Sequence, residues 1–116
     1  PTPVYEAIVQ AKNMTARDET ILPLWPFEKI TSALTGKRVL FWNENVTLDF
    51  EEKNKQAYYF VANQMTESGR EEFLVKNNIR TIISYLGSIQ SPPPYLVEKF
   101  KNNLMVVYRV ELNDNR

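Results

Sequence analysis

The apolar residues of this chain recur at helical spacing in some segments and run continuously in others. Helical spacing, in which every third or fourth position is apolar, predicts amphipathic helices. Short continuous apolar runs bounded by glycine, proline or asparagine predict strands that are covered on both faces. The predicted helices span residues 4–14, 26–36, 55–65, 68–78 and 93–100. The predicted strands span residues 19–25, 38–42, 79–87 and 104–112.

Residues that start or stop regular structure support several of these boundaries. Pro23 cannot donate a hydrogen bond to a neighbouring strand, so its strand either ends there or lies at an edge of the sheet. Ser68 and Glu71 have the spacing of a capping box and predict the start of a helix. Asn77 or Asn78 can adopt the left-handed conformation that ends the same helix.

The alternation of helices and strands predicts a small α/β domain. Alternation favours a three-layer sandwich of about four mostly parallel strands between helices. The order leaves open whether the last strand is antiparallel and lies at an edge. A chain of 116 residues is expected to form a single soluble domain over residues 1–116. The expected core residues of the sheet are Val39, Phe41, Ile82, Ile83, Val106 and Tyr108.

Composition excludes several classes of function. The 14 basic and 14 acidic residues cancel, so no broad positive field favours nucleic acid. The chain has neither cysteine nor histidine, which excludes a Ser-His-Asp triad, a cysteine nucleophile and zinc sites built on those ligands. Its 3 glycines lie far apart and form no phosphate-binding loop. We therefore expect no cofactor, no bound metal, no catalytic residue and no nucleic-acid partner.

Polar residues follow two of the predicted strands directly. In open α/β sheets, ligands bind beyond the carboxyl ends of the strands. Trp42, Asn43, Glu44 and Asn45 stand at one such end, and Gly87 stands at another. These five residues are the candidate ligand contacts. The alternative interpretation is that polar side chains only satisfy the backbone where a strand leaves the core.

Two other patterns bear on function. Glu44 with Asp49 or Glu51 could form the acid pair of a small enzyme, although a charged loop segment is more often a solvated surface. Asn13-Met14-Thr15 and Asn45-Val46-Thr47 both match the acceptor pattern for N-glycosylation, which is compatible with an extracytoplasmic location.

Four stretches together resemble a known group of proteins. They are "ALTGKRVLFW", the pair Tyr58-Tyr59, "FLVKNNIRTIISY" and the closing "VVYRV". Their order resembles the soluble tail that follows the last membrane helix in glycosyltransferases of the dolichyl-phosphate-mannose type and their relatives. The resemblance covers roughly residues 4–112 and rests on structural motifs. Lys37 between Gly36 and Arg38 departs from the turn that is usual in such tails.

This resemblance implies a non-catalytic, extracytoplasmic domain of a membrane glycosyltransferase-like protein. In that family the catalytic acids lie in loops between membrane helices, so no catalytic role is carried over to this chain. The implied partners are the membrane-embedded part of its own parent chain and a sugar or lipid-linked sugar. Because the sequence starts at Pro1 without methionine, we expect a piece excised from a longer protein, with a transmembrane helix shortly before Pro1. The main alternative is a free-standing soluble α/β binding or interaction module.

Overall fold

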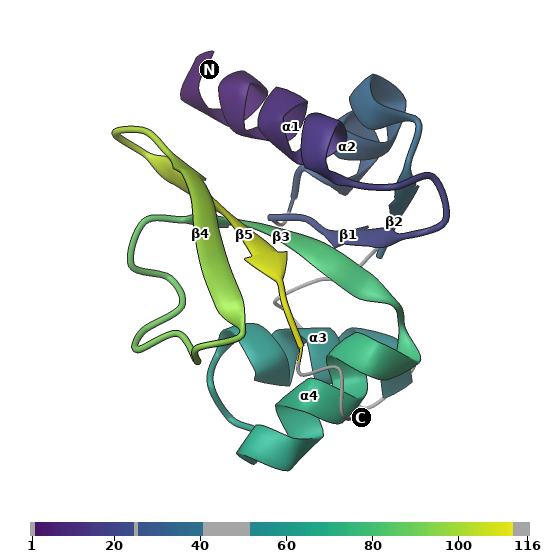
Figure 1. The fold of residues 1–116 in the computed structure, drawn as a ribbon, viewed down its shortest axis with the longest axis vertical. Helices are drawn as coiled ribbons and strands as arrows, with labels where there is room; N and C mark the ends of the chain where they lie inside the picture. The colour runs from purple at the N-terminus through teal and green to yellow at the C-terminus, as the bar shows by residue number, and fades with distance from the viewer. Residues whose placement is uncertain (1, 25, 41–51, 113–116) are drawn as a thin grey trace.

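The helices lie on the two faces of a single sheet. The computed structural model describes residues 2–24, 26–40 and 52–112. Figure 1 shows α1 (Thr2–Met14) and α2 (Glu28–Thr35) on one face of the sheet, and α3 (Glu52–Val61) and α4 (Glu67–Lys76) on the other. The predicted α/β class and the three-layer arrangement are therefore confirmed.

The sheet is mixed rather than mostly parallel. The described residues form five strands, and their order across the sheet is β2-β1-β3-β5-β4. Strand β1 pairs with β2 and β3 in parallel, whereas β5 pairs with β3 and β4 in antiparallel fashion. The last strand is thus antiparallel, but it lies inside the sheet and not at an edge. The strands are β1 (Thr20–Leu22), β2 (Arg38–Val39), β3 (Ile79–Tyr85), β4 (Leu96–Lys101) and β5 (Met105–Val110).

Neighbouring residues of the central strands enter different halves of the core. Successive side chains of a strand point to opposite faces of the sheet. Ile82 packs in the cluster that includes α3 and α4, whereas Ile83 packs in the cluster that includes α1. Val106 and Val107 divide in the same way. The continuous apolar runs of β3 and β5 therefore have a direct cause, because both faces of these strands are covered by helices.

The predicted core residues are confirmed in four positions. Ile82, Ile83, Val106 and Tyr108 are buried, with exposed fractions between 1% and 7%. Val39 is only half-buried because it belongs to the short edge strand β2. Phe41 lies outside the described residues.

The predicted boundaries are confirmed at the ends of α2, α4 and β1. Gly36 follows α2 with a φ of 66° in the left-handed region, which glycine adopts without steric cost. Asn78 has a φ of 52° just after α4 and so occupies the predicted stop position. Strand β1 ends at Leu22, immediately before Pro23.

The N-cap of α4 is Thr66 and not Ser68, so the predicted capping box is wrong. The Thr66 side chain accepts a hydrogen bond from the backbone N–H of Gly69 at 3.1 Å. Ser68 lies inside the first turn. A threonine two residues upstream provides the same chemistry as serine, and the helix begins one position after it, at Glu67.

Replacing Thr66 by alanine should lower the free energy of unfolding by about 1 kcal/mol, because one N–H of the first turn loses its acceptor. Ser68→Ala is the matched control, and we expect it to change stability by less than about 0.5 kcal/mol. Urea unfolding followed by circular dichroism measures both. Equal losses for the two variants would contradict the assigned cap.

The predicted helix over residues 93–100 is wrong, since residues 96–100 belong to strand β4 and residues 93–95 precede it. Tyr95, Leu96 and Phe100 fit helical spacing, but a short apolar segment fits a strand equally well. The overlooked signal was Asn102. Its Oδ1 accepts hydrogen bonds from the backbone N–H groups of Leu104, at 3.0 Å, and Met105, at 2.8 Å. These two bonds stabilise the tight turn between β4 and β5.

A partly buried ion pair fastens the end of α1 to the sheet. Arg109 of β5 donates from Nη1 to Glu19 Oε1 at 2.7 Å and from Nη2 to Glu19 Oε2 at 2.9 Å. The same Nη1 donates to the backbone carbonyl of Met14 at 3.1 Å. This two-pronged pairing is the geometry in which arginine binds a carboxylate most strongly. We call Arg109, Glu19 and the Met14 carbonyl the Arg109 clamp.

Candidate functional site

The structure places only one of the five sequence-predicted contacts. Trp42, Asn43, Glu44 and Asn45 lie outside the described residues, as do Asp49 and Glu51 of the alternative acid pair. Gly87 lies in the exposed turn that follows β3, with a φ of 80°. A left-handed turn accounts for a glycine there by backbone conformation alone.

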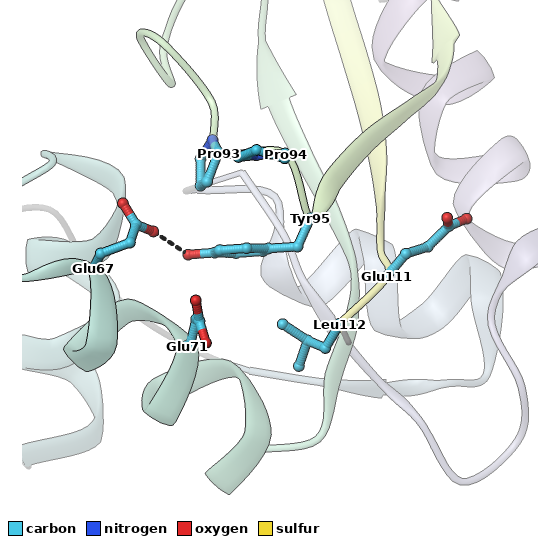
Figure 2. Close-up of a pocket in the computed structure, with 7 residues that line it drawn as sticks. All are labelled: Glu67, Glu71, Pro93, Pro94, Tyr95, Glu111 and Leu112. Atoms are coloured by element: carbon cyan, nitrogen blue, oxygen red, sulfur yellow. Dashed lines mark hydrogen bonds between the residues drawn. The ribbon is translucent and has the colours of Figure 1, made fainter. Parts of the chain in front are cut away.

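A groove of about 540 Å³ lies on the α4 side of the sheet. One wall is α4, another is the proline segment that leads into β4, and the third is the chain that leaves β5 (Figure 2). Sequence reasoning missed this site because its walls come from three segments that are distant along the chain. The groove is lined by Glu67, Glu71, Pro93, Pro94, Tyr95, Glu111 and Leu112.

Tyr95 crosses the groove and joins two of its walls. Figure 2 shows its hydroxyl pointing at Glu67, to which it donates a hydrogen bond of 2.5 Å at Oε1. Its backbone carbonyl accepts a hydrogen bond from the N–H of Glu111 at 2.8 Å, which holds the third wall in place. Burial, reinforced by the hydrogen bond to Glu67, raises the pKa of Tyr95 well above its usual value. The tyrosine therefore remains protonated and continues to donate throughout the physiological range.

The carboxylates give the groove its polar character. Figure 2 shows Glu67 and Glu71 on the α4 wall beside the Tyr95 ring, while Glu111 lies on the opposite wall. Glu67 Oε2 lies 3.8 Å from Nη1 of Arg70, and Glu111 Oε2 lies 3.4 Å from Nζ of Lys99. An ionised carboxylate has about four acceptor positions, so one contact leaves capacity for a ligand. The groove can accept hydrogen bonds from hydroxyl or ammonium groups while offering proline and leucine carbons as an apolar wall.

Arg70 is a buried residue of α4 that contacts α3. Its side chain is buried, with 3% of the residue exposed, and its guanidinium carbon lies 5.0 Å from the centre of the Phe60 ring. This is a cation–π contact, which is stronger away from water. Two of its nitrogens, Nε and Nη2, find no hydrogen-bond partner within the part of the chain that the structure describes. Arg70 is thus held by Phe60 and Glu67 and links α3 to α4.

Neither a metal site nor a membrane span emerges from the described ranges. Among residues 2–24, 26–40 and 52–112, no three carboxylates are grouped so that they could hold a metal ion. No helix in these ranges has the length and apolar character to cross a membrane.

Replacing Tyr95 by phenylalanine should lower the free energy of unfolding by about 1.5–3 kcal/mol, because a hydrogen bond to a charged carboxylate is lost inside the groove wall. Since the folded-state pKa is raised, this contribution should be present below the ordinary tyrosine pKa of 10.0 and should fade as the pH rises further. Urea unfolding at pH 7 and at pH 10.5 measures the effect. Tyr59→Phe, at a tyrosine with 39% exposure, is the control, and equal losses in the two variants would contradict the assignment.

The comparisons with known proteins identify a fold and no sequence family. No protein-family model matches the chain, and no curated protein matches it at a significant level. A solved structure with the same fold is the C-terminal globular domain of an oligosaccharyltransferase from Archaeoglobus fulgidus. The two share 14% sequence identity with a TM-score of 0.59, and the alignment covers 92% of this chain and 95% of that chain.

This structural likeness covers the whole domain and not a local motif. The alignment covers both chains almost completely. At such low identity the likeness establishes a common fold. The fold of this chain is therefore similar to that of a globular domain found at the C-terminus of an oligosaccharyltransferase.

Proposed function

We propose that this chain is a non-catalytic, extracytoplasmic domain of a membrane protein of the glycosyltransferase type. The observation that carries the proposal is the near-complete structural match to the C-terminal globular domain of an oligosaccharyltransferase. The four sequence stretches that resemble tails of dolichyl-phosphate-mannose-type transferases support it independently. On this proposal the domain packs on the membrane-embedded part of its parent, which supplies the catalytic acids.

The proposal that this domain is non-catalytic has a chemical basis. The chain contains no histidine and no cysteine, so proton transfer would fall to carboxylates, tyrosine or lysine. In the groove, Glu67 is bonded to Tyr95 and Glu111 is paired with Lys99. Both carboxylates already accept from a neighbouring side chain in the fold, and the proposal assigns them the same acceptor role toward a ligand. The groove is thus equipped for binding.

We further propose that the groove binds the sugar part of an acceptor or of a lipid-linked sugar. A sugar presents hydroxyl donors along its edge and C–H groups on its face. Glu67 and Glu71 can accept from the hydroxyls, while Pro93 and Leu112 provide apolar contact for the C–H groups. Such a site would bind weakly by itself, because it is open and its few contacts must offset the loss of ligand freedom.

A titration of the ¹⁵N-labelled domain with a mannose oligosaccharide tests the role of the groove. Amide shifts should concentrate at Glu67, Glu71, Tyr95 and Glu111, and Glu71→Gln should weaken binding severalfold. Glu98→Gln, at an exposed position on β4, is the control and should leave the affinity unchanged. Shifts that are absent, or that are spread over the α1 face, would exclude the groove as the sugar site.

The location of the domain can be tested with one introduced thiol, because the domain itself has no cysteine. Ser88 lies in an exposed turn and can be replaced by cysteine in the full-length protein. A maleimide that does not cross membranes should label Ser88→Cys in intact cells, whereas the unsubstituted protein serves as the blank. Labelling only after permeabilisation would refute an extracytoplasmic location. A full-length protein that remains soluble after cell fractionation would instead indicate the free-standing binding module.

A further inference from the structure

The glycosylation acceptor pattern Asn13-Met14-Thr15 is split between the surface and the core. Asn13 lies in the last turn of α1 and is exposed. Thr15, two residues later, is buried with 5% of its surface exposed. The pattern requires serine or threonine at this position, so the transferring enzyme must read the hydroxyl as well as the asparagine amide. In the folded domain these two groups are not presented together.

The Thr15 hydroxyl is also fully engaged in the fold. Its Oγ1 donates to the carbonyl of Ala11 at 2.5 Å and shares a second hydrogen bond with Thr81 Oγ1 at 2.7 Å. Thr81 belongs to β3 and is itself completely buried. Exposing the hydroxyl therefore means breaking a bond between α1 and the centre of the sheet, which leaves the Thr81 hydroxyl without that partner.

The middle residue of the pattern is held as well. The Met14 carbonyl accepts a hydrogen bond from Nη1 of Arg109 at 3.1 Å, within the Arg109 clamp. The backbone N–H of Thr15 points back to the carbonyl of Lys12 at 3.4 Å. An enzyme that must bind the three residues in an extended form would have to unwind the end of α1 and release the clamp. Thr15 and Met14 thus resist recognition for separate structural reasons, although Asn13 itself is exposed.

We propose that Asn13 is an N-glycosylation site that is open in the unfolded chain and closed by folding. In the transfer, Nδ2 of Asn13 forms a bond to the anomeric carbon of a sugar carried on a polyprenyl diphosphate. The bond from that carbon to the phosphate oxygen breaks, the polyprenyl diphosphate leaves with the electron pair, and the amide gives one proton to a base of the enzyme. Folding and glycosylation therefore compete, and the order of the two events decides whether the chain is modified.

A glycan attached before folding remains compatible with the native structure. Only the Asn13 side chain carries the sugar, and this side chain is exposed at the end of α1. The buried Thr15 hydroxyl is unchanged by the reaction and can still bond to Ala11 and Thr81. This site does not depend on the groove. Its use in a cell requires that the chain enter the glycosylating compartment, as the proposed location provides. The following test uses purified components and therefore does not depend on that location.

The test compares one acceptor in three states. The substrates are the folded chain, the same chain carrying Ile82→Asp so that it stays unfolded, and a peptide of residues 8–20. Asn45→Gln is present in both chains, which removes the second acceptor pattern. Each substrate is incubated with a lipid-linked oligosaccharide and a purified oligosaccharyltransferase that needs only Asn-X-Thr, and the glycopeptide is measured by mass spectrometry. Circular dichroism verifies which chain is folded.

We expect the peptide and the unfolded chain to be modified at Asn13 and the folded chain to react at least about tenfold more slowly, since only transient local opening exposes its acceptor. Adding Asn13→Gln to the unfolded chain should abolish the product. Equal rates for the folded chain and the peptide would overturn the proposal, and so would a peptide that is not modified at all. If Ile82→Asp leaves the chain folded, the comparison with the peptide still decides the question.

Discussion

Replacing Ile82 by alanine should lower the free energy of unfolding by about 2–5 kcal/mol. Ile82 has 1% of its surface exposed and lies in β3, between β1 and β5, on the face covered by α3 and α4. Removing its side chain loses buried apolar area and leaves a cavity that a sheet cannot easily collapse. The midpoint of urea unfolding, measured by circular dichroism, should fall with little change in the slope.

The same substitution at an exposed isoleucine is the control for this experiment. Ile30 lies on α2 with 48% exposure, and Ile30→Ala should change stability by no more than about 0.5 kcal/mol. An unchanged midpoint in Ile82→Ala would mean that the centre of the sheet is not packed as the structure shows. Similar losses at both positions would indicate that Ile82 is no more deeply packed than Ile30.

Breaking the Arg109 clamp should have the second-largest effect. Arg109→Met removes both bonds to Glu19 and the bond to the Met14 carbonyl. The Glu19 carboxylate then keeps the N–H of Ala16 but loses its ion-pair partner. The side chains of Arg109 and Glu19 are 25% and 17% exposed, which places this pair between a surface pair and a fully buried one. We expect a loss of about 2–3 kcal/mol in the free energy of unfolding at neutral pH. Thermal and urea unfolding both measure it.

The clamp also predicts a dependence on pH. The hydrogen bond from Arg109 holds the pKa of Glu19 below its ordinary value of 4.5, against the opposing effect of burial. A carboxyl with a lowered folded-state pKa contributes stability above its unfolded-state pKa and loses it as the pH falls through the folded-state pKa. Glu19→Gln should therefore lower stability at neutral pH and flatten the decline in stability below about pH 4.5.

An exposed ion pair provides the matched control for the clamp. Lys99 and Glu111 lie 3.4 Å apart with side-chain exposures of 45% and 52%, so Lys99→Met should cost at most about 1 kcal/mol. The double variant Arg109→Met/Glu19→Gln should be more stable than the sum of the two single losses implies, because the second change removes a stranded charge. Strict additivity would show that the two side chains do not interact in solution.

The candidate site was less accessible to sequence reasoning than the fold. Sequence patterns directed attention to strand ends, where Gly87 proves to occupy a turn and the residues around Glu44 lie outside the described part of the chain. The groove was overlooked because Glu67, Tyr95 and Glu111 come from three different elements. Nothing in the local sequence around Tyr95 shows that its hydroxyl meets Glu67, since their contact depends on how the fold brings α4 to the segment that precedes β4.

Local patterns were sufficient where the physical cause was local. The left-handed conformation of Gly36, the helix stop at Asn78 and the end of β1 before Pro23 each depend on the backbone preferences of one residue. The burial of Ile82 and Val106 also followed from sequence, because only a strand covered on both faces requires a continuous apolar run. These features determine the α/β class and its alternation of layers.

Tertiary structure decided the features that depend on pairing. Leu96 and Phe100 suit a helix and a strand about equally. The antiparallel pairing of this segment with β5 selects the strand. That pairing places β5 inside the sheet, turns half of the sheet antiparallel and brings Tyr95 to the groove. The Arg109 clamp and the burial of Thr15 against Thr81 likewise join residues that are distant in sequence. Such contacts depend on the packing energy of the whole domain, which cannot be inferred from the residues of one short segment.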